Sequence, residues 1–345
     1  MLFRSGLYGQ EFLFKDNGST PSNAYNSEYH IQDVYEICAS PENRDYVKQM
    51  IMEHGAATIG VNADNKFWNN HNKNLYSYFD EEQAPTADHE VLIIGWDDNY
   101  SASNFVKKPQ GDGAWICKNS WGSKSGEKGC FYLSYYDETT WISNAAAYNA
   151  VSQEDNNWYD NNYQVAGFIT NTVSALEDEK NYVVALSGST NPYGVLYEAK
   201  GDENLAAIGL MALDSYQQYE VEIYVNPEME DGKIVFSDQT KADFYKKISA
   251  LSGGYHTFSL DSEIELAEGD RFFVLIKPVT KGRLVYEEAA DYTSEANYDE
   301  WNNLTGNIHN HYEASGFSYY ISDDGNAMIP QDDKDFFVKA YTKNR

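Results

Sequence analysis

Cysteine is scarce in this chain, with only Cys38, Cys117 and Cys130 among 345 residues. A small and odd number of cysteines excludes a disulfide-stapled miniprotein, because such scaffolds carry even sets of cysteines in fewer than about 100 residues. The same count leaves the redox compartment open. At about 150 residues per domain, the length predicts two domains, each large enough to bury a core of its own.

Positive charge is also in short supply. The chain has 25 Lys and Arg against 54 Asp and Glu, which gives a formal net charge of −29 and a pI near 4.4. Affinity for nucleic acid comes mainly from cationic groups that displace counterions from phosphates. We therefore expect neither nucleic acid nor anionic membranes as partners.

Long hydrophobic runs are absent, since no stretch approaches the roughly 20 apolar residues of a membrane span. Residues 1–14 interrupt their apolar residues with Gly6, Gln10 and Glu11, unlike a signal peptide. We expect either a cytoplasmic protein or an export signal that lies outside this sequence. Apolar residues still make up 42% and aromatic residues 15%, with 29 Tyr, so the chain has the material to fold.

Residues 1–150 have the pattern of a mixed α and β unit. Ser40-Pro41 predicts a helix start with a serine N-cap, and Gly55 predicts its end. Core-facing positions between them recur at helical spacing, at Val47, Met50, Ile51 and His54. Four strand-like runs follow, at residues 56–61, 90–96, 114–118 and 130–136. The pattern predicts a small barrel or half-barrel preceded by a helix.

The segment 152–163 (SQEDNNWYDNNY) is polar with almost nothing to bury, so we place a domain boundary beside it, between 1–150 and 151–345. The later pattern is nearly all β. Residues 219–225 alternate apolar and polar positions, as in a strand with one buried face. Further strand candidates are residues 205–213, 255–260, 271–278, 317–322 and 336–342. Several short strands separated by turns predict a β-sandwich.

Two strings in the first unit carry chemistry. They are ADHEVLIIGW at residues 87–96, and WICKNSWG at residues 115–122 continuing to GEKG at 126–129. His89 opens an apolar run, so a strand would hold its imidazole at a rigid edge that substrate can reach. Asn119 ends the next such run, where it can accept a hydrogen bond from one ring nitrogen while the other faces a nucleophile. Trp121 can cover that bond and keep water out.

These strings resemble the histidine and asparagine motifs of the papain-like cysteine peptidases. The resemblance implies that His89 is the general base and ion-pair partner, Asn119 its orienter and Trp121 the shield. Asp88 occupies the family position beside the histidine, where it shapes the cleft rather than doing chemistry. No metal and no cofactor is expected.

The sequence also departs from that family. Ser125 replaces a second tryptophan, and residues 97–112 form an insertion that separates His89 from Asn119 by 30 residues. The nucleophile motif C-G-[SA]-C-[WY] and its upstream glutamine are missing from the 88 residues before His89. We therefore expect no nucleophile in this chain, and expect either that Met1 is not the true start or that the gene is a fragment. A thiol lobe supplied by another chain is a further alternative.

Three cysteines must be weighed as substitutes. Cys38 precedes the predicted helix, whose N-terminus lowers a thiol pKa. The resemblance places that helix inside the histidine-bearing lobe, which favours a buried, inert Cys38. Cys117 and Cys130 fall on strands beside Asn119, where we expect core residues, with a cross-strand disulfide as the alternative.

Residues 155–345 resemble the lectin-like domain that follows the peptidase unit in some bacterial extracellular papain-like proteins. The resemblance rests on ENLAAIG at 203–209, YEVEIY at 219–224, GYHTF at 254–258 with Leu260, LAEGDRF at 266–272 and VKAYT at 338–342. Several polar groups are candidate ligands. The run 323–326 (DDGN) favours a turn over a Ca²⁺ site, His309 and His311 lack a third zinc ligand, and His256 is expected to be packed or solvated.

The expected fold is α+β: a papain-like β-rich lobe without the N-terminal helical lobe, followed by an all-β jelly-roll or lectin-like sandwich. The expected function is Cys-His-Asn hydrolysis of peptide bonds, with this chain inactive alone. The alternative is a non-catalytic glycan-binding, cell-wall-binding or adhesion protein on a degenerate peptidase scaffold. Expected partners are a peptide substrate and, through residues 151–345, a glycan or cell wall, at the cell surface or outside the cell.

Overall fold

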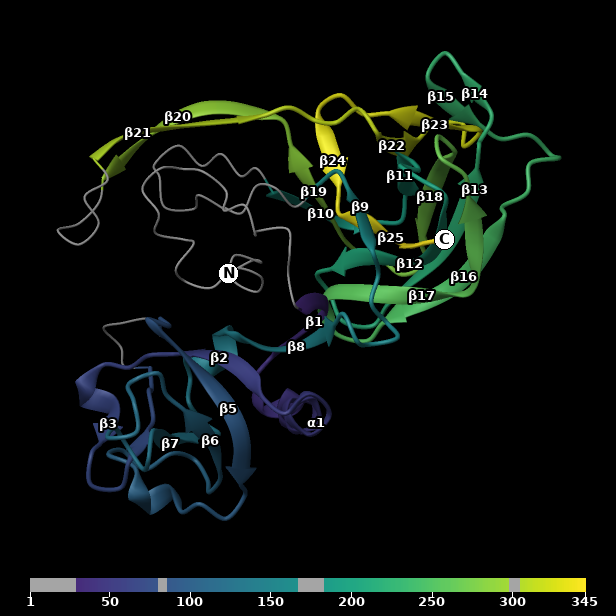
Figure 1. Ribbon diagram of the computed structural model, residues 1–345. Helices are drawn as coiled ribbons and strands as arrows, with labels where there is room; N and C mark the ends of the chain where they lie inside the picture. The colour runs from purple at the N-terminus through teal and green to yellow at the C-terminus, as the bar shows by residue number, and fades with distance from the viewer. Residues whose placement is uncertain (1–28, 80–85, 167–182, 298–304) are drawn as a thin grey trace. The chain divides into compact units, whose positions relative to one another are not determined.

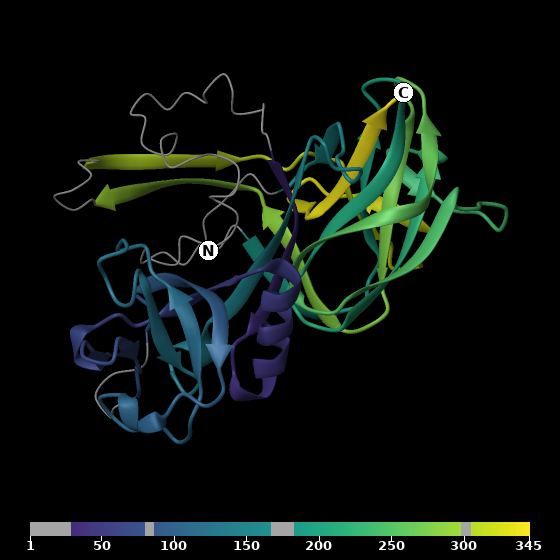
Figure 2. The same cartoon turned by 60° about the horizontal axis from the view of Figure 1, so that its bottom comes forward.

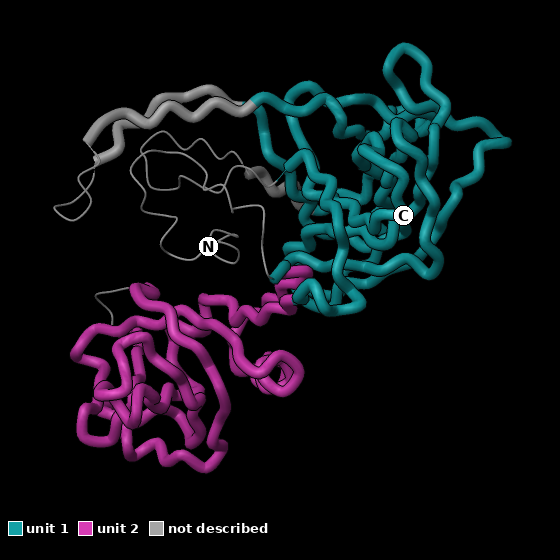
Figure 3. The backbone as a smooth tube through the Cα atoms, viewed as in Figure 1, with its two compact units in different colours: residues 1–30, 151–345 teal, residues 31–150 magenta. Residues whose placement is uncertain are grey.

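A computed structural model of the protein describes residues 29–79, 86–166, 183–297 and 305–345, with only the backbone for 183–187, 290–297 and 305–312. The described residues form two compact units, one within 31–150 and the other within 151–345 together with residues 29 and 30 (Figure 3). Each unit is considered by itself. Residues 1–14, expected not to form a signal peptide, lie outside the described residues.

The unit 31–150 is built on one sheet with one α-helix, as Figure 1 shows. Its strands are β1 (Tyr29–Cys38), β2 (Ala57–Val61), β3 (Trp68–Asn69), β4 (Asn74–Leu75), β5 (His89–Asp97), β6 (Ala114–Lys118), β7 (Cys130–Ser134) and β8 (Asn144–Ser152). They lie in the order β3-β4-β7-β6-β5-β2-β8-β1. The four predicted strands are confirmed as β2, β5, β6 and β7. The expectation that a helix comes first was wrong, because β1 precedes it.

Helix α1 (Arg44–His54) packs against β2 and β5, as Figure 2 also shows. Val47, Met50 and Ile51 are buried, as their helical spacing predicts. Gly55 ends the helix at φ 84°, and its N–H donates to the carbonyl of Ile51. The predicted serine cap was wrong. Ser40 makes no side-chain cap bond, because a 3₁₀ turn, η2 (Pro41–Asn43), opens at the proline first.

The predicted insertion forms an ordered connection between β5 and β6. It contains η4 (Ala102–Asn104), and the two other short 3₁₀ turns of this unit are η3 (Asn65–Phe67) and η5 (Thr140–Ile142). The Asn104 carbonyl accepts hydrogen bonds from the side-chain amides of Asn69, Asn72 and Asn74. These three hydrogen bonds attach the connection to the β3–β4 edge of the sheet. The connection joins the end of β5 to the start of β6, so it is at the opposite end of these strands from His89 and Lys118.

The second unit is a β-sandwich. Its strands are β9 (Asn161–Gln164), β10 (Val183–Ser189), β11 (Tyr193–Glu198), β12 (Glu203–Ala212), β13 (Gln217–Val225), β14 (Met229–Glu230), β15 (Lys233–Val235), β16 (Phe244–Ala250), β17 (Gly253–Leu266), β18 (Arg271–Pro278), β19 (Gly282–Glu288), β20 (Ala290–Asn297), β21 (Thr305–Tyr312), β22 (Ser318–Ile321), β23 (Ala327–Pro330), β24 (Lys334–Phe336) and β25 (Val338–Asn344). One layer has the order β17-β12-β25-β9 and the other has β14-β15-β23-β22-β11-β18-β13-β16. Strands β10-β19-β24 and β20-β21 form two smaller sheets.

The main core of this unit lies between those two layers. Val221 and Ile223 of β13 and Val274 of β18 meet Ile208 of β12 and Val338 of β25 there. The alternation predicted for residues 219–225 is confirmed at its first three apolar positions, whereas Val225 is only partly buried. The fold is therefore rich in strands, with a single α-helix among the described residues.

The polar segment 152–163 buries more than its composition suggests, so the expectation of almost nothing to bury was wrong. Tyr159 and Tyr163 are buried, and β9 begins at Asn161. The hydroxyl of Tyr163 donates to the buried carboxylate of Glu203 on β12. A polar tip on an aromatic ring can thus enter a core where it finds a partner.

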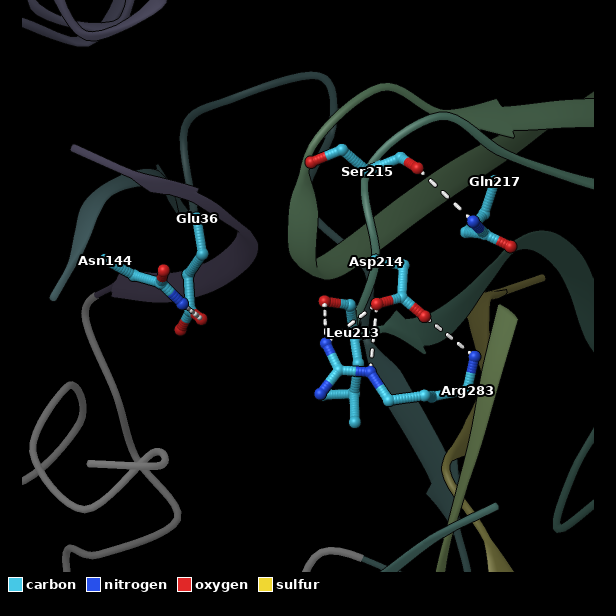
Figure 4. Close-up of polar contacts among 7 residues, drawn as sticks. All are labelled: Glu36, Asn144, Leu213, Asp214, Ser215, Gln217 and Arg283. Atoms are coloured by element: carbon cyan, nitrogen blue, oxygen red, sulfur yellow. Dashed lines mark hydrogen bonds and ion pairs between the residues drawn. The ribbon is translucent and has the colours of Figure 1, made fainter. Parts of the chain in front are cut away.

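Each unit also has polar contacts near its surface, and Figure 4 shows one from each. In the sandwich, Arg283 of β19 donates from Nε to Asp214 Oδ1 at 2.9 Å and from its backbone N–H to Oδ2 at 2.8 Å. Burial raises the pKa of Asp214, but the hydrogen bonds from Arg283 outweigh it and lower that pKa overall. In the other unit, Asn144 donates to Glu36 at 3.4 Å. In the described ranges, no helix has the length and hydrophobicity that crossing a membrane requires.

Candidate active site

The pairing of β5 with β6 brings His89 and Asn119 together. Leu92 lies opposite Lys118, so the first residue of β5 and the residue after β6 stand at the same edge of the sheet. His89 Nε2 and Asn119 Oδ1 are 2.9 Å apart, and Asn119 is only 7% exposed. A strand end is rigid, and the imidazole is therefore held in one position relative to the amide.

The hydrogen-bond pattern determines which ring nitrogen carries the proton. The backbone N–H of Ser120 donates to Asn119 Oδ1 at 2.8 Å, which fixes the amide oxygen on the side that faces His89. An amide oxygen only accepts hydrogen bonds, so Nε2 of neutral His89 must be the donor. Nδ1 is left with its lone pair, and this is the nitrogen that can take a proton from another group.

Trp121 lies against the imidazole. The two ring centroids are 5.0 Å apart and the ring planes are 25° from parallel. Trp121 covers one face of the His89 ring. Because Trp121 is 52% exposed, the opposite side of the indole is in solvent. Its position is supported by Trp68, whose ring lies 5.6 Å away and whose Nε1 donates to the Ala63 carbonyl. Sequence reasoning missed Trp68, although a lone tryptophan in the polar stretch 62–74 is a signal for it.

Asp88 makes its hydrogen bonds to the backbone at the end of β2 and just after it. Its carboxylate accepts a hydrogen bond from the Ala63 N–H at 2.7 Å, and its own N–H donates to the Val61 carbonyl. These bonds fix the turn that follows β2 and hold the backbone just before His89. Asp88 thus acts on the site through the chain rather than through the ring.

The glycines after Asn119 have a steric role. The Asn119 N–H donates to the Gly129 carbonyl at 2.9 Å, which folds the loop 120–129 back on itself. Gly126 has φ 59°, and a Cβ there would stand 2.2 Å from the Cys130 carbonyl oxygen. Only glycine fits at that position. Ser125 lies within this loop, and its backbone carbonyl accepts a hydrogen bond from the Gly129 N–H.

All three cysteines are free thiols held away from the imidazole. Cys117 is fully buried opposite Ile93, which at ~3.3 Å per residue lies about 13 Å along β5 from His89. Burial raises the pKa of the Cys117 thiol well above its usual range. Cys130 is partly exposed, not a core residue as expected, and its opposite neighbour is Lys118 rather than Cys117, which leaves the disulfide alternative without support.

Cys38 is engaged elsewhere in the unit. Its Sγ donates to the Trp141 carbonyl at 3.0 Å, and its own carbonyl accepts from Asn43. It lies at the end of β1, before the η2 turn rather than at the first turn of α1. The helix N-terminus that could activate this thiol therefore begins six residues later, at Arg44.

The other polar candidates are engaged in structure. His256 is buried, with Nε2 2.9 Å from the Ser252 carbonyl oxygen. In the run 323–326, the Asp324 carboxylate accepts from Ser322 and from the Asn326 N–H, which closes the turn. The side chains of His309 and His311 lie outside the described residues. Among the residues that are described, no cluster of three or more His, Cys, Asp or Glu could hold a metal ion.

Two family models match this chain. Residues 9–150 match the papain family cysteine protease, and residues 178–342 match the lectin like domain. A cysteine protease of Blomia tropicalis is 26% identical over 150 residues, which are 43% of this chain and 41% of that protein. The chain thus spans about two fifths of the length of this relative.

Two solved structures share the fold across nearly the whole chain. The clostridial cysteine protease Cwp84 after propeptide cleavage has a TM-score of 0.66 at 23% identity, covering 95% of this chain and 75% of that one. The cysteine protease and lectin-like domains of Cwp84, a surface layer associated protein of Clostridium difficile, give 0.64 at 23% identity, with 99% and 69% covered. The α+β prediction, a papain-like β-rich lobe followed by a lectin-like β domain, is confirmed.

Proposed function

Because this chain joins a papain-family cysteine protease domain to a lectin-like domain, we propose that His89 is the general base of a peptide-bond hydrolase and Asn119 its orienter. The single observation that carries this proposal is the 2.9 Å contact between His89 Nε2 and Asn119 Oδ1, which leaves Nδ1 as the base. We place the boundary between the catalytic part and the accessory domain at residues 150 and 151.

The chemistry follows from that geometry. A cysteine thiol transfers its proton to Nδ1 of His89, and the resulting thiolate attacks the carbonyl carbon of the scissile peptide bond. The imidazolium then gives its proton to the leaving amine, and water releases the acyl group from sulfur. A neutral amide at Asn119 orients the ring through both steps without adding a charge beside the thiolate and imidazolium. Trp121 excludes water from one side of the ring.

None of the three cysteines of this chain is the nucleophile in this proposal. Cys117 is buried at a distance along the sheet, Cys130 belongs to the strand beyond it, and Cys38 donates to a backbone carbonyl. The chain alone is therefore expected not to hydrolyse peptides. Removing one member of such a catalytic unit eliminates most of the rate.

A peptidyl epoxide that alkylates catalytic thiols tests the proposal. The reagent is incubated with this 345-residue chain and, in parallel, with the native protein from its source cells, and labelled cysteines are mapped by mass spectrometry. We expect hydrolysis of a fluorogenic peptide and labelling only in the native protein, at none of Cys38, Cys117 or Cys130. Labelling at one of these three, or a native protein that neither hydrolyses peptides nor reacts, would contradict the proposal.

We further propose that residues 151–345 attach the protein to a glycan or cell-wall polymer at the cell surface. The match of residues 178–342 to the lectin like domain supports a sugar ligand. The structural neighbour Cwp84 is a surface layer associated protein, which supports the location. A peptidase held on a glycan meets substrates at high local concentration, which gives the accessory domain a purpose. Binding of the chain to saccharides tests this part of the proposal.

A further inference from the structure

A pocket opens on the side of the eight-stranded sheet that faces away from the main core. Ile223 and Val274 point into that core, so their neighbours Tyr224 and Leu275 point to the opposite side. There they form the floor of a pocket of about 500 Å³. This volume lies within the ~300–1,000 Å³ typical of small-molecule sites.

The walls of the pocket are apolar and partly aromatic. Phe236 stands beside Tyr224 with ring centroids 5.2 Å apart and planes at 46°, and it is only partly buried. Pro192 and Ile321 line the pocket as well. An aromatic ring whose face stays in contact with solvent in a pocket can pack against another flat, apolar surface.

The polar groups at this pocket are already held in position. Lys277 Nζ lies 2.6 Å from Glu222 Oε1, and the Tyr224 hydroxyl donates to Glu222 Oε2 at 2.5 Å. Burial, followed by this hydrogen bond to Glu222, raises the pKa of Tyr224, so its hydroxyl stays protonated and its oxygen can accept a further bond. The lysine ammonium uses one of its three donors on Glu222.

Two hydroxyls at the rim complete the set. Ser237 and Thr240 line the pocket, and their side-chain oxygens lie 3.2 Å apart. The Thr240 hydroxyl also accepts from the Ser237 N–H at 2.9 Å, which fixes the rim loop. The pocket therefore combines an apolar face with fixed donors and acceptors at its edge.

We propose that this pocket binds one ring of a neutral saccharide, with its C–H face on Phe236 and its hydroxyl groups on Lys277, Ser237 and Thr240. A sugar ring presents an apolar face and a polar circumference, which is the same division that the pocket shows. This inference rests on the proposed glycan-binding role of residues 151–345 and names the site for it.

The charges around the pocket favour a neutral sugar over an acidic one. Lys277 is the one basic residue among those that line the described pocket, and Glu222 already neutralises it. Asp238 lies between the two rim hydroxyls in the chain, and Asp324 precedes the lining residue Gly325. A uronic acid would meet net repulsion from these carboxylates.

Isothermal titration calorimetry on the full chain tests the proposal. The probes are chitotetraose, mannotetraose and cellotetraose as neutral saccharides, with tetragalacturonate as the acidic one. The variants are Phe236→Ala and Lys277→Met, and the matched control is Lys246→Met. Lys246 is also a lysine of this sheet in a 2.6 Å ion pair, but its partner is Asp261 and it does not line the pocket. Urea unfolding verifies that each variant is folded.

We expect at least one neutral probe to bind with a Kd of roughly 10 mM or tighter, and tetragalacturonate to bind at least about tenfold more weakly. Phe236→Ala and Lys277→Met should each weaken neutral binding about tenfold or more, and Lys246→Met should leave it unchanged. If a neutral probe binds and neither pocket variant weakens it, the pocket assignment is wrong but the glycan-binding role stands. If tetragalacturonate binds more tightly than the neutral probes, the proposed preference for neutral sugars is wrong. If no probe binds, both the pocket and the glycan role fail, whereas the peptidase proposal is unaffected.

Discussion

The side-chain oxygen of Asn119 has two hydrogen-bond partners, and this pairing determines what the His89 ring can do. The Ser120 N–H fixes the amide oxygen, and the amide oxygen fixes the proton on Nε2. A histidine oriented this way needs no charged neighbour to hold its tautomer. The sequence placed both residues at the ends of apolar runs. The bond from the Ser120 N–H depends on the backbone conformation after β6, and the packing of Trp68 on Trp121 is a tertiary contact, so neither follows from periodicity.

Asp137 is a second residue whose environment has a measurable consequence. Its carboxylate is fully buried and accepts from the N–H and hydroxyl of Ser77 and from the N–H groups of Thr139 and Thr140. Burial raises the pKa of Asp137 from 3.8 to about 6, against these hydrogen bonds.

This shift predicts a pH dependence of stability. Between pH 4 and pH 6 the folded chain binds more protons at Asp137 than the unfolded chain does, so the free energy of unfolding falls as the pH rises. The full loss is about 3 kcal/mol and is complete above the folded pKa. Urea unfolding of wild type and Asp137→Asn across this range should show a difference that shrinks as the pH rises. The exposed Asp45→Asn variant is the control, and a flat difference for Asp137→Asn would contradict the prediction.

At the scale of elements, the sequence pattern located strands that are short runs of mostly apolar residues. Residues 114–118 and 271–278 are strands β6 and β18 with the predicted bounds. Strand β1 was missed because its buried residues include the polar Gln32 and Asp33, and β9 was missed because all its residues but Tyr163 are Asn or Gln. A polar side chain can be buried only where a partner comes from another part of the chain, and a periodic pattern does not contain that information.

Strand β9 shows how such partners work. The Glu203 carboxylate is buried and accepts from Tyr163 and Asn161 of β9, from Thr342 of β25 and from the Lys200 N–H. These bonds fix the edge strand β9 to its neighbour β25 and to β12, the next strand in the sheet. A buried carboxylate that loses a donor is costly, because the charge stays desolvated.

Tyr163→Phe should therefore lower the free energy of unfolding of the sandwich by about 1.5–3 kcal/mol. Tyr197→Phe is the matched control, because that buried hydroxyl donates to the neutral Val338 carbonyl at 2.7 Å, where the expected loss is about 1 kcal/mol. Urea titration followed by tyrosine fluorescence measures both. A Tyr163→Phe loss equal to or smaller than that of Tyr197→Phe would show that Glu203 does not depend on its tyrosine donor.

For the whole molecule, the formal charge of −29 is the dominant long-range property. Mutual repulsion of like charges destabilises a compact chain, and its ion pairs are mostly exposed and contribute little in compensation. Salt screens repulsion between exposed charges over about 10 Å at 0.1 M.

Scanning calorimetry should therefore show transition temperatures that rise when NaCl is raised from about 20 mM to about 300 mM at pH 7. The rise should vanish near the pI of 4.4, where positive and negative charges balance. Transition temperatures that fall with salt at pH 7 would mean that the ion pairs outweigh the net repulsion.

The proposed catalytic role depends on one basic ring nitrogen, Nδ1 of His89. The protonation of both nitrogens of that ring can be measured by ¹⁵N NMR of the histidine side chains. At a pH where the His89 ring is neutral, we expect Nε2 to carry the proton and Nδ1 to have the chemical shift of an unprotonated nitrogen. Asn119→Ala should convert this single tautomer into a mixture. A His89 ring protonated on Nδ1 in the wild-type chain, or a tautomer that Asn119→Ala leaves unchanged, would contradict the proposed base and its orienter.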